Sequence, residues 1–162
     1  MAAQAGSGSA VVTLPAENQI LITREFAAPR QLVFKAYTTP ELIKRWWAGK
    51  RGAVTLAEVD LRVGGTWRFV MVTPQGLEVA FHGEYREVVV NERIVNTEIY
   101  EAMPGEGVVN TVTFREANGR TTMTMLTEAP SKEIRDAIIN SGMEGGMQEG
   151  MDLLEEIAIS LM

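Results

Sequence analysis

Few side chains in this sequence have the types and spacing that catalysis requires. The single histidine, His82, falls in the middle of a predicted strand, where it is more readily a surface residue than a general base. With one histidine and no cysteine, a metal site built on two histidines or on thiolates cannot form. Glu58 shares a strand face with Asp60, and Glu84 shares one with Arg86, which favours solvated cross-strand ion pairs. We therefore predict no catalytic residue, no metal and no cofactor.

Aromatic and methionine side chains indicate a different chemistry, the enclosure of an apolar molecule. Trp67 and Phe69 share one face of a predicted strand, and Phe81 and Tyr85 share one face of another. Packing of these rings in the core and at its rim is the alternative interpretation. The predicted ligand-binding residues are Trp46, Trp67, Phe69, Met71, Phe81, Tyr85, Met143, Met147 and Met151, with Trp46 and Trp67 near an opening.

A pocket of this kind also needs a few polar groups that orient its ligand. Tyr85, Thr97 and His82 are the candidates for such a polar anchor. Their assignment depends on strand register, because a shift of one residue exchanges the two faces of a strand.

The stretch from Ser131 to Met162 predicts one long amphipathic helix that faces these strands. Pro130 ends the preceding segment, and Ser131 is suited to cap free N–H groups at the start of the helix. The acidic residues expected on the side opposite the apolar face are Glu144, Glu149, Asp152, Glu155 and Glu156.

Glycine and methionine alternate in an unusual way in the middle of this helix. Met143, Met147 and Met151 recur at every fourth position, beside Gly142, Gly146 and Gly150. Each interior glycine costs about 1 kcal/mol relative to alanine, so a packing or functional reason is expected. Either the glycines let the helix lie flush on a sheet, or glycine and methionine together form an adaptable pocket wall.

The elements before this helix predict an antiparallel sheet. A strand at residues 18–26 and two short helices at 31–37 and 41–47 come first. Six more strands follow at meander spacing, at residues 54–62, 66–73, 78–90, 93–100, 108–115 and 120–127. We predict an α+β fold in which a curved sheet of six to seven strands surrounds the long C-terminal helix. A cavity between the two is the expected by-product.

Composition limits the range of functions. The chain has 162 residues, is 46% hydrophobic and carries a formal net charge of −6, with its basic residues scattered. This charge argues against nucleic acid and anionic membrane surfaces as partners. The absence of cysteine, of a signal peptide pattern and of an apolar run long enough for a membrane span favours a cytoplasmic protein. Residues 1–17 are predicted to be a flexible tail, and residues 18–162 a single domain.

Several runs together resemble a known superfamily. They are ITREFAAPRQLVFKAYTTPELIKRWWAG, DLRVGGTWRFVMVTPQG, FHGEYREV, ERIVNTE, VTF and RTTMTM. These runs are similar to the SRPBCC superfamily, and within it to the group related to the C-terminal domain of the activator of heat shock protein 90 ATPase. The resemblance implies the helix-grip fold of START and Bet v 1-like proteins, in which a curved sheet grips a long C-terminal helix around a hydrophobic cavity. Where many relatives carry a tryptophan after the glycine of that helix, this chain has Gly146-Met147.

Members of this superfamily differ in what they do, because a fold does not determine a function. We predict non-catalytic binding of a lipid-like, aromatic or polyketide-like molecule between the sheet and the C-terminal helix. The resemblance leaves two alternatives open, a chaperone-interacting protein and a polyketide cyclase-like enzyme. A homodimer is also left open.

Overall fold

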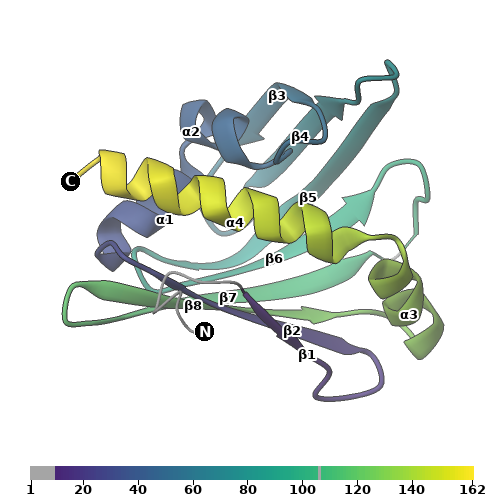
Figure 1. Cartoon of the computed structure of the whole chain (residues 1–162). Coiled ribbons are helices and arrows are strands. Elements are labelled where there is room, and N and C mark those ends of the chain that lie inside the picture. The colour runs from purple at the N-terminus through teal and green to yellow at the C-terminus, as the bar shows by residue number, and fades with distance from the viewer. Residues whose placement is uncertain (1–9, 106) are drawn as a thin grey trace.

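The computed structural model describes residues 10–105 and 107–162, which form one antiparallel sheet and four helices (Figure 1). The helices are α1 (Arg30–Thr38), α2 (Pro40–Trp46), α3 (Lys132–Asn140) and α4 (Met143–Ser160). The strands are β1 (Val11–Thr13), β2 (Gln19–Phe26), β3 (Ala53–Val59), β4 (Thr66–Val72), β5 (Glu78–Val89), β6 (Arg93–Tyr100), β7 (Val108–Ala117) and β8 (Arg120–Glu128).

The sheet has the strand order β1-β2-β8-β7-β6-β5-β4-β3, and every neighbouring pair is antiparallel. Figure 1 shows the sheet curving around α4, with α1 and α2 near the C-terminal end of that helix and α3 beyond its start. The predicted α+β class and the antiparallel sheet around a C-terminal helix are confirmed. The sheet face toward α4 is called the inner face below; its core residues include Ile22, Trp67, Tyr85, Ile94, Val112 and Met123.

The sheet has eight strands, one more than the upper end of the predicted range. The additional strand is β1, whose residues Val11–Thr13 pair with Leu21–Thr23 of β2. This strand lies inside the segment that the sequence predicts as a flexible tail. Residues 1–9 of that predicted tail lie outside the described residues.

The prediction of a single helix from Ser131 to Met162 is wrong in one respect, because the structure has two helices in this stretch, α3 and α4. The capping prediction holds, since the Ser131 hydroxyl accepts a hydrogen bond from the Ile134 N–H at 3.2 Å. Gly142 then interrupts the helical backbone with a φ of 84°, a left-handed conformation that glycine adopts without steric cost. The chain changes direction there, and only α4 runs along the sheet (Figure 1).

The glycines of α4 contact α2 and the loop after it, not the sheet. A Cβ atom on Gly150 would lie 3.1 Å from the Trp46 carbonyl oxygen, and one on Gly146 would lie 3.5 Å from Cδ of Arg51. The backbone of α4 approaches α1 and α2 more closely than it approaches any strand. The alternative in which these glycines let the helix lie flush on a sheet is therefore wrong, because Trp46 and Arg51 lie against them instead.

Candidate functional site

One half of the inner face is aromatic and lies beneath α2. Trp67 and Phe69 of β4 and Phe81 of β5 point to the same side, as the strand periods predict. The ring centroids of Trp67 and Phe69 are 4.8 Å apart, and the Trp47 ring packs edge-on against Phe69 at 5.4 Å and Phe81 at 5.5 Å. The side chains of this half therefore form an apolar surface of closely packed aromatic rings.

Gly83 allows Trp67 its position on the inner face. Trp67 is paired with Gly83 in the neighbouring strand, and its indole N–H reaches over Gly83 to the Thr97 carbonyl oxygen at 3.1 Å. A Cβ atom on residue 83 would collide with the same carbonyl oxygen. The register shift of β5 lies beyond this glycine, between Tyr85 and Glu87.

The other half of the inner face carries a row of polar side chains at one level of the sheet. Tyr85 of β5 pairs with Asn96 of β6, Asn96 pairs with Asn110 of β7, and Asn110 pairs with Thr127 of β8. The Thr127 hydroxyl donates to Oδ1 of Asn110 at 2.7 Å. The Nδ2 of Asn110 donates in turn to Oε1 of Glu98 at 2.7 Å. These contacts form a chain of donors that ends at the Glu98 carboxyl.

Glu98 is an unusual residue to find on this face. It lies two residues beyond Asn96 and four beyond the buried Ile94, so all three share the inner side of β6. Burial raises the pKa of the Glu98 carboxyl, and the hydrogen bond from Asn110 opposes that rise. Within the described part of the chain, Glu98 forms no ion pair with a lysine, arginine or histidine. Residues 1–9 and 106 contain none of these three residue types.

Two tyrosines approach the same region from different elements. Tyr37 of α1 stacks on Trp46 at 5.4 Å, and its ring lies edge-on to Phe114 at 5.7 Å. Burial is the main cause that raises the pKa of Tyr37, and the charges of Glu98 and Tyr85 add to it. Burial also raises the pKa of Tyr85, with a smaller effect from Asp60. Both phenols therefore remain neutral hydrogen-bonding groups across the physiological pH range.

Methionines of α4 lie across from these residues, and their burial changes along the helix. Met151 is buried, as are Leu154 and Ile157 after it, whereas Met143 and Met147 are half-buried although they pack against the core. The interface between α4 and the sheet is thus closely packed toward the C-terminal end of α4. It is looser toward the N-terminal end.

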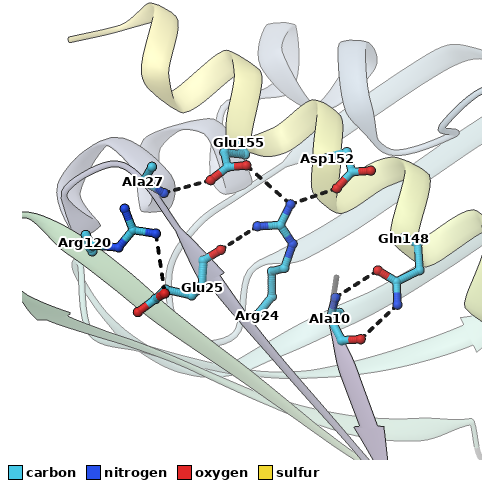
Figure 2. A network of polar contacts seen from close by, with 8 residues as sticks. All are labelled: Ala10, Arg24, Glu25, Ala27, Arg120, Gln148, Asp152 and Glu155. Atoms are coloured by element: carbon cyan, nitrogen blue, oxygen red, sulfur yellow. Dashed lines mark hydrogen bonds and ion pairs between the residues drawn. The ribbon is translucent and has the colours of Figure 1, made fainter. Parts of the chain in front are cut away.

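A buried arginine joins the closely packed part of α4 to β2 (Figure 2). Arg24 follows Ile20 and Ile22 on the inner side of β2, and only 1% of its surface is exposed. Its Nη2 lies 2.8 Å from Oδ1 of Asp152 and 3.4 Å from Oε1 of Glu155. Oε2 of Glu155 accepts the N–H of Ala27 at 2.8 Å. Glu155 is therefore buried and bound to the sheet, so the prediction that it lies opposite the apolar face is wrong.

The first described residue is held to α4 by a side chain (Figure 2). The amide of Gln148 accepts the Ala10 N–H and donates to the Ala10 carbonyl oxygen, both at 2.9 Å. This pair of bonds imitates the pairing of a neighbouring strand. It holds the start of β1 beside the side of α4 that faces β2.

The structure separates the predicted ligand-binding residues into groups, and their role in binding remains a prediction. Trp67, Phe69, Phe81, Tyr85, Met143, Met147 and Met151 belong to the inner core or pack against it. Trp46 is also in the core, and its indole N–H donates to the Ala36 carbonyl oxygen at 2.9 Å. Trp46 and Trp67 are buried, so neither lies at an exposed opening. Met71 lies apart from this cluster, with its methyl group against Gly52.

Two of the three predicted polar anchors face the other way. His82 lies on the outer face, where its Nδ1 is 2.8 Å from Oε2 of Glu101, and Arg68 holds the same carboxylate at 2.8 Å. Thr97 has the strand parity opposite to Glu98, and its hydroxyl accepts the Glu84 N–H. Of the three, only Tyr85 lies on the inner face.

The polar residues that sequence reasoning missed are Asn96, Glu98, Asn110 and Thr127. A signal for them exists, because each occupies an apolar position of a strand. Asn96 and Glu98 continue the inner parity of Ile94, and Asn110 precedes Val112 and Phe114 at the same spacing. A separate surface hollow of about 480 Å³ is lined by Arg30, Gln31, Asn91 and Glu116, and it contains none of these residues.

Comparison with known proteins agrees with this architecture. A Rhodobacter sphaeroides protein superimposes with a TM-score of 0.88 at 23% identity, covering 94% of this chain and 99% of its own. A Nitrosomonas europaea protein superimposes with a TM-score of 0.81 at 25% identity, covering 91% of this chain and 98% of its own. A Staphylococcus epidermidis protein superimposes with a TM-score of 0.78 at 27% identity, covering 92% of this chain and 94% of its own.

No curated protein matches the chain. Among the residues that the structure describes, no helix is long and apolar enough to cross a membrane. The family model described as Activator of Hsp90 ATPase homolog 1-like protein matches residues 27–158, from the end of β2 almost to the end of α4. The chain therefore belongs to the family of Activator of Hsp90 ATPase homolog 1-like proteins, as its sequence motifs predict.

Proposed function

We propose that this protein binds a hydrophobic small molecule between the inner face of the sheet and α4. The observation that carries the proposal concerns Glu98 and Tyr37. Tyr37 stacks on the core residue Trp46 and Glu98 is held by Asn110 on the inner face, yet both side chains keep accessible surface. Polar side chains that keep some accessible surface beside an apolar wall are what a ligand pocket with a few placed polar groups presents, and this supports the proposal.

The packing of α4 supports the same location. Met143 and Met147 keep part of their surface although they face the core, and α4 lies close to α1 and α2 and not to the strands. Methionine adapts its shape to irregular neighbours, so this wall suits ligands of differing outline. The aromatic residues Trp67, Phe69 and Phe81 supply the opposite wall.

Native mass spectrometry of the purified protein tests the proposal. We expect a small molecule that is retained in the native spectrum and lost on denaturation. The variant Met147→Trp reduces the volume of the space and should lower the occupied fraction. The matched control is Met103→Trp, at a side chain that is 75% exposed, and it should leave occupancy unchanged. A protein that is empty, and that also fails to bind added hydrophobic probes, would overturn the proposal.

A second candidate is acid–base catalysis in the same place, and Glu98 is the observation that favours it. A carboxylate whose pKa is raised by burial is a stronger base than an exposed one, which suits it to accept a proton from a bound carbon acid. With the ketone 2-tetralone as probe, the carboxylate would take an α-proton and leave an enolate, and would then return a deuteron from D₂O. Deuterium exchange that is accelerated by the protein and lost in Glu98→Gln would support catalysis. Binding without accelerated exchange would exclude it for this substrate.

Partner binding through the adjacent tryptophans has less support. Trp46 is buried, and Trp47 is half-buried against Phe69 and Phe81. An exposed tryptophan pair, which would mark a chaperone-binding surface, is therefore not a feature of α2.

A further inference from the structure

We propose that Glu98 selects the ligand, so that the polar end of the bound molecule is a hydrogen-bond donor, either a hydroxyl or a protonated amine, and carboxylates are rejected. This inference rests on the proposed function, because it concerns the polar end of the same internal space. It adds a chemical class to the ligand and a specificity-determining residue to the chain.

The direction of the hydrogen bonds leads to this conclusion. Thr127 donates to Oδ1 of Asn110, and this bond fixes the Asn110 amide with its Nδ2 toward Glu98. In each of the two hydrogen bonds the donor is on the side of Thr127 and the acceptor is on the side of Glu98, so Glu98 is the final acceptor. Oε1 of Glu98 is occupied by Asn110, and Oε2 forms no hydrogen bond within the described part of the chain. A carboxylate oxygen in this position is completed by a donor that the ligand brings.

The charge of the surroundings points to the same class of ligand. A partly desolvated carboxylate without a cation is costly, and among the described residues the one hydrogen bond that offsets this cost comes from the Asn110 amide. A protonated amine on the ligand would supply the missing positive charge, and a hydroxyl would supply a neutral donor. A carboxylate would bring a second negative charge into a region of low dielectric constant, where repulsion between like charges is strong. The tyrosines are neutral and do not compensate that repulsion.

Probes that share a naphthalene ring and differ in one substituent isolate the effect of Glu98 on the polar end of the ligand. We would measure the affinities of naphthalene, 2-naphthol, 2-(aminomethyl)naphthalene and 2-naphthoate at pH 8 by tryptophan fluorescence. In the wild type we expect the amine and the alcohol to bind at least about tenfold more tightly than the carboxylate. In Glu98→Gln, which keeps an acceptor for Asn110 but removes the charge, we expect the amine to lose its advantage and the carboxylate to gain affinity.

Glu101→Gln is the matched control. It removes the same charge from the outer face of the sheet, where Glu101 binds Arg68 and His82, and it should leave the order of affinities unchanged. Similar affinities for all four probes in both the wild type and Glu98→Gln would overturn the assignment of Glu98 while the proposed function stands. Failure of every probe to bind would overturn both. A preference for the amine alone or for the alcohol alone would identify which donor the site accepts.

Discussion

Asn110 Nδ2 donates a hydrogen bond to Oε1 of Glu98 across 2.7 Å, and this contact places an oriented carboxyl on the inner face of the sheet. The two residues come from neighbouring strands, β6 and β7, whose register also pairs Asn96 with Asn110. The polar row lies on the same face as the aromatic wall of Trp67, Phe69 and Phe81. One face of the sheet thus combines an apolar surface with the carboxyl of Glu98.

The raised pKa of Glu98 predicts how stability depends on pH. The folded protein holds the proton of Glu98 more tightly than the unfolded chain, whose carboxyl has a pKa near 4.5. The contribution of Glu98 to the free energy of unfolding therefore falls as the pH rises from about 4.5 through the folded pKa, by about 1.4 kcal/mol per unit of pKa difference. We expect Glu98→Gln to be more stable than the wild type at pH 8, with a smaller gain at pH 4. Urea unfolding at both values measures this difference, and an equal gain at both would contradict it.

Replacement of Arg24 should destabilise the protein strongly. Arg24→Met removes the positive charge beside Glu155, which is buried and would remain without a cationic partner. Breaking a buried ion pair in this way costs about 3–5 kcal/mol. The double variant Arg24→Met/Glu155→Gln should recover part of the loss, because it removes the stranded charge. Urea unfolding of the three proteins measures both effects.

Arg120 provides the control for that experiment (Figure 2). It pairs with Glu25 at 3.4 Å, and both side chains are more than a third exposed. Such exposed pairs contribute about 0–1 kcal/mol, so Arg120→Met should change the free energy of unfolding little. A loss in Arg120→Met as large as that in Arg24→Met would refute the distinction between the two pairs.

Two glycines of α4 should respond differently to the same substitution. Gly146→Ala places a methyl group in ordinary contact with Arg51 at 3.5 Å, so the higher helix propensity of alanine should stabilise the protein by about 0.5–1 kcal/mol. Gly150→Ala places it 3.1 Å from the Trp46 carbonyl oxygen, a backbone atom that cannot rotate away. We expect Gly150→Ala to be the less stable variant in thermal unfolding. The reverse order would show that α4 does not lie against α2 as described.

The outer face offers a direct test by titration. The hydrogen bond from Arg68, followed by that from His82, lowers the pKa of Glu101 to about 2. This group stabilises the folded state above its unfolded pKa near 4.5, and the contribution is lost as the pH falls through about 2. In ¹³C NMR of the carboxyl groups, Arg68→Gln should raise the midpoint of Glu101 toward 4.5. Arg93→Gln, which breaks a different exposed pair, should not move it, and a midpoint already near 4.5 in the wild type would contradict the contact.

Most of the fold could be predicted from the sequence because the strands alternate regularly and turn residues separate them. β1 could not, because Val11–Thr13 is too short to give a pattern and depends on its pairing with β2 and on Gln148. The break at Gly142 was concealed by the run of glycines that follows it. Both errors concern local segments whose conformation is decided by distant partners or by one backbone angle.

The candidate site was predictable in its apolar half only. Shared strand parity placed Trp67, Phe69, Phe81 and Tyr85 on one surface, and the structure does the same. The polar half was missed because its residues come from separate strands and become a row only through the register. The position of Glu155 was predicted wrongly because helical periodicity carries no information about Arg24, which reaches Glu155 from β2.

The measurement that tests the central claim most directly is NMR of protein labelled with ¹³C at its methionine methyl groups, during titration with 2-naphthol. The methionines are spread over the molecule, with Met143 and Met147 half-buried beside the core, and Met103 and Met162 each 75% exposed. A ligand between the sheet and α4 should shift the methyl signals of Met143 and Met147 and leave those of Met103 and Met162 unchanged. Shifts confined to the exposed methionines would place the ligand outside the inner face and contradict the account.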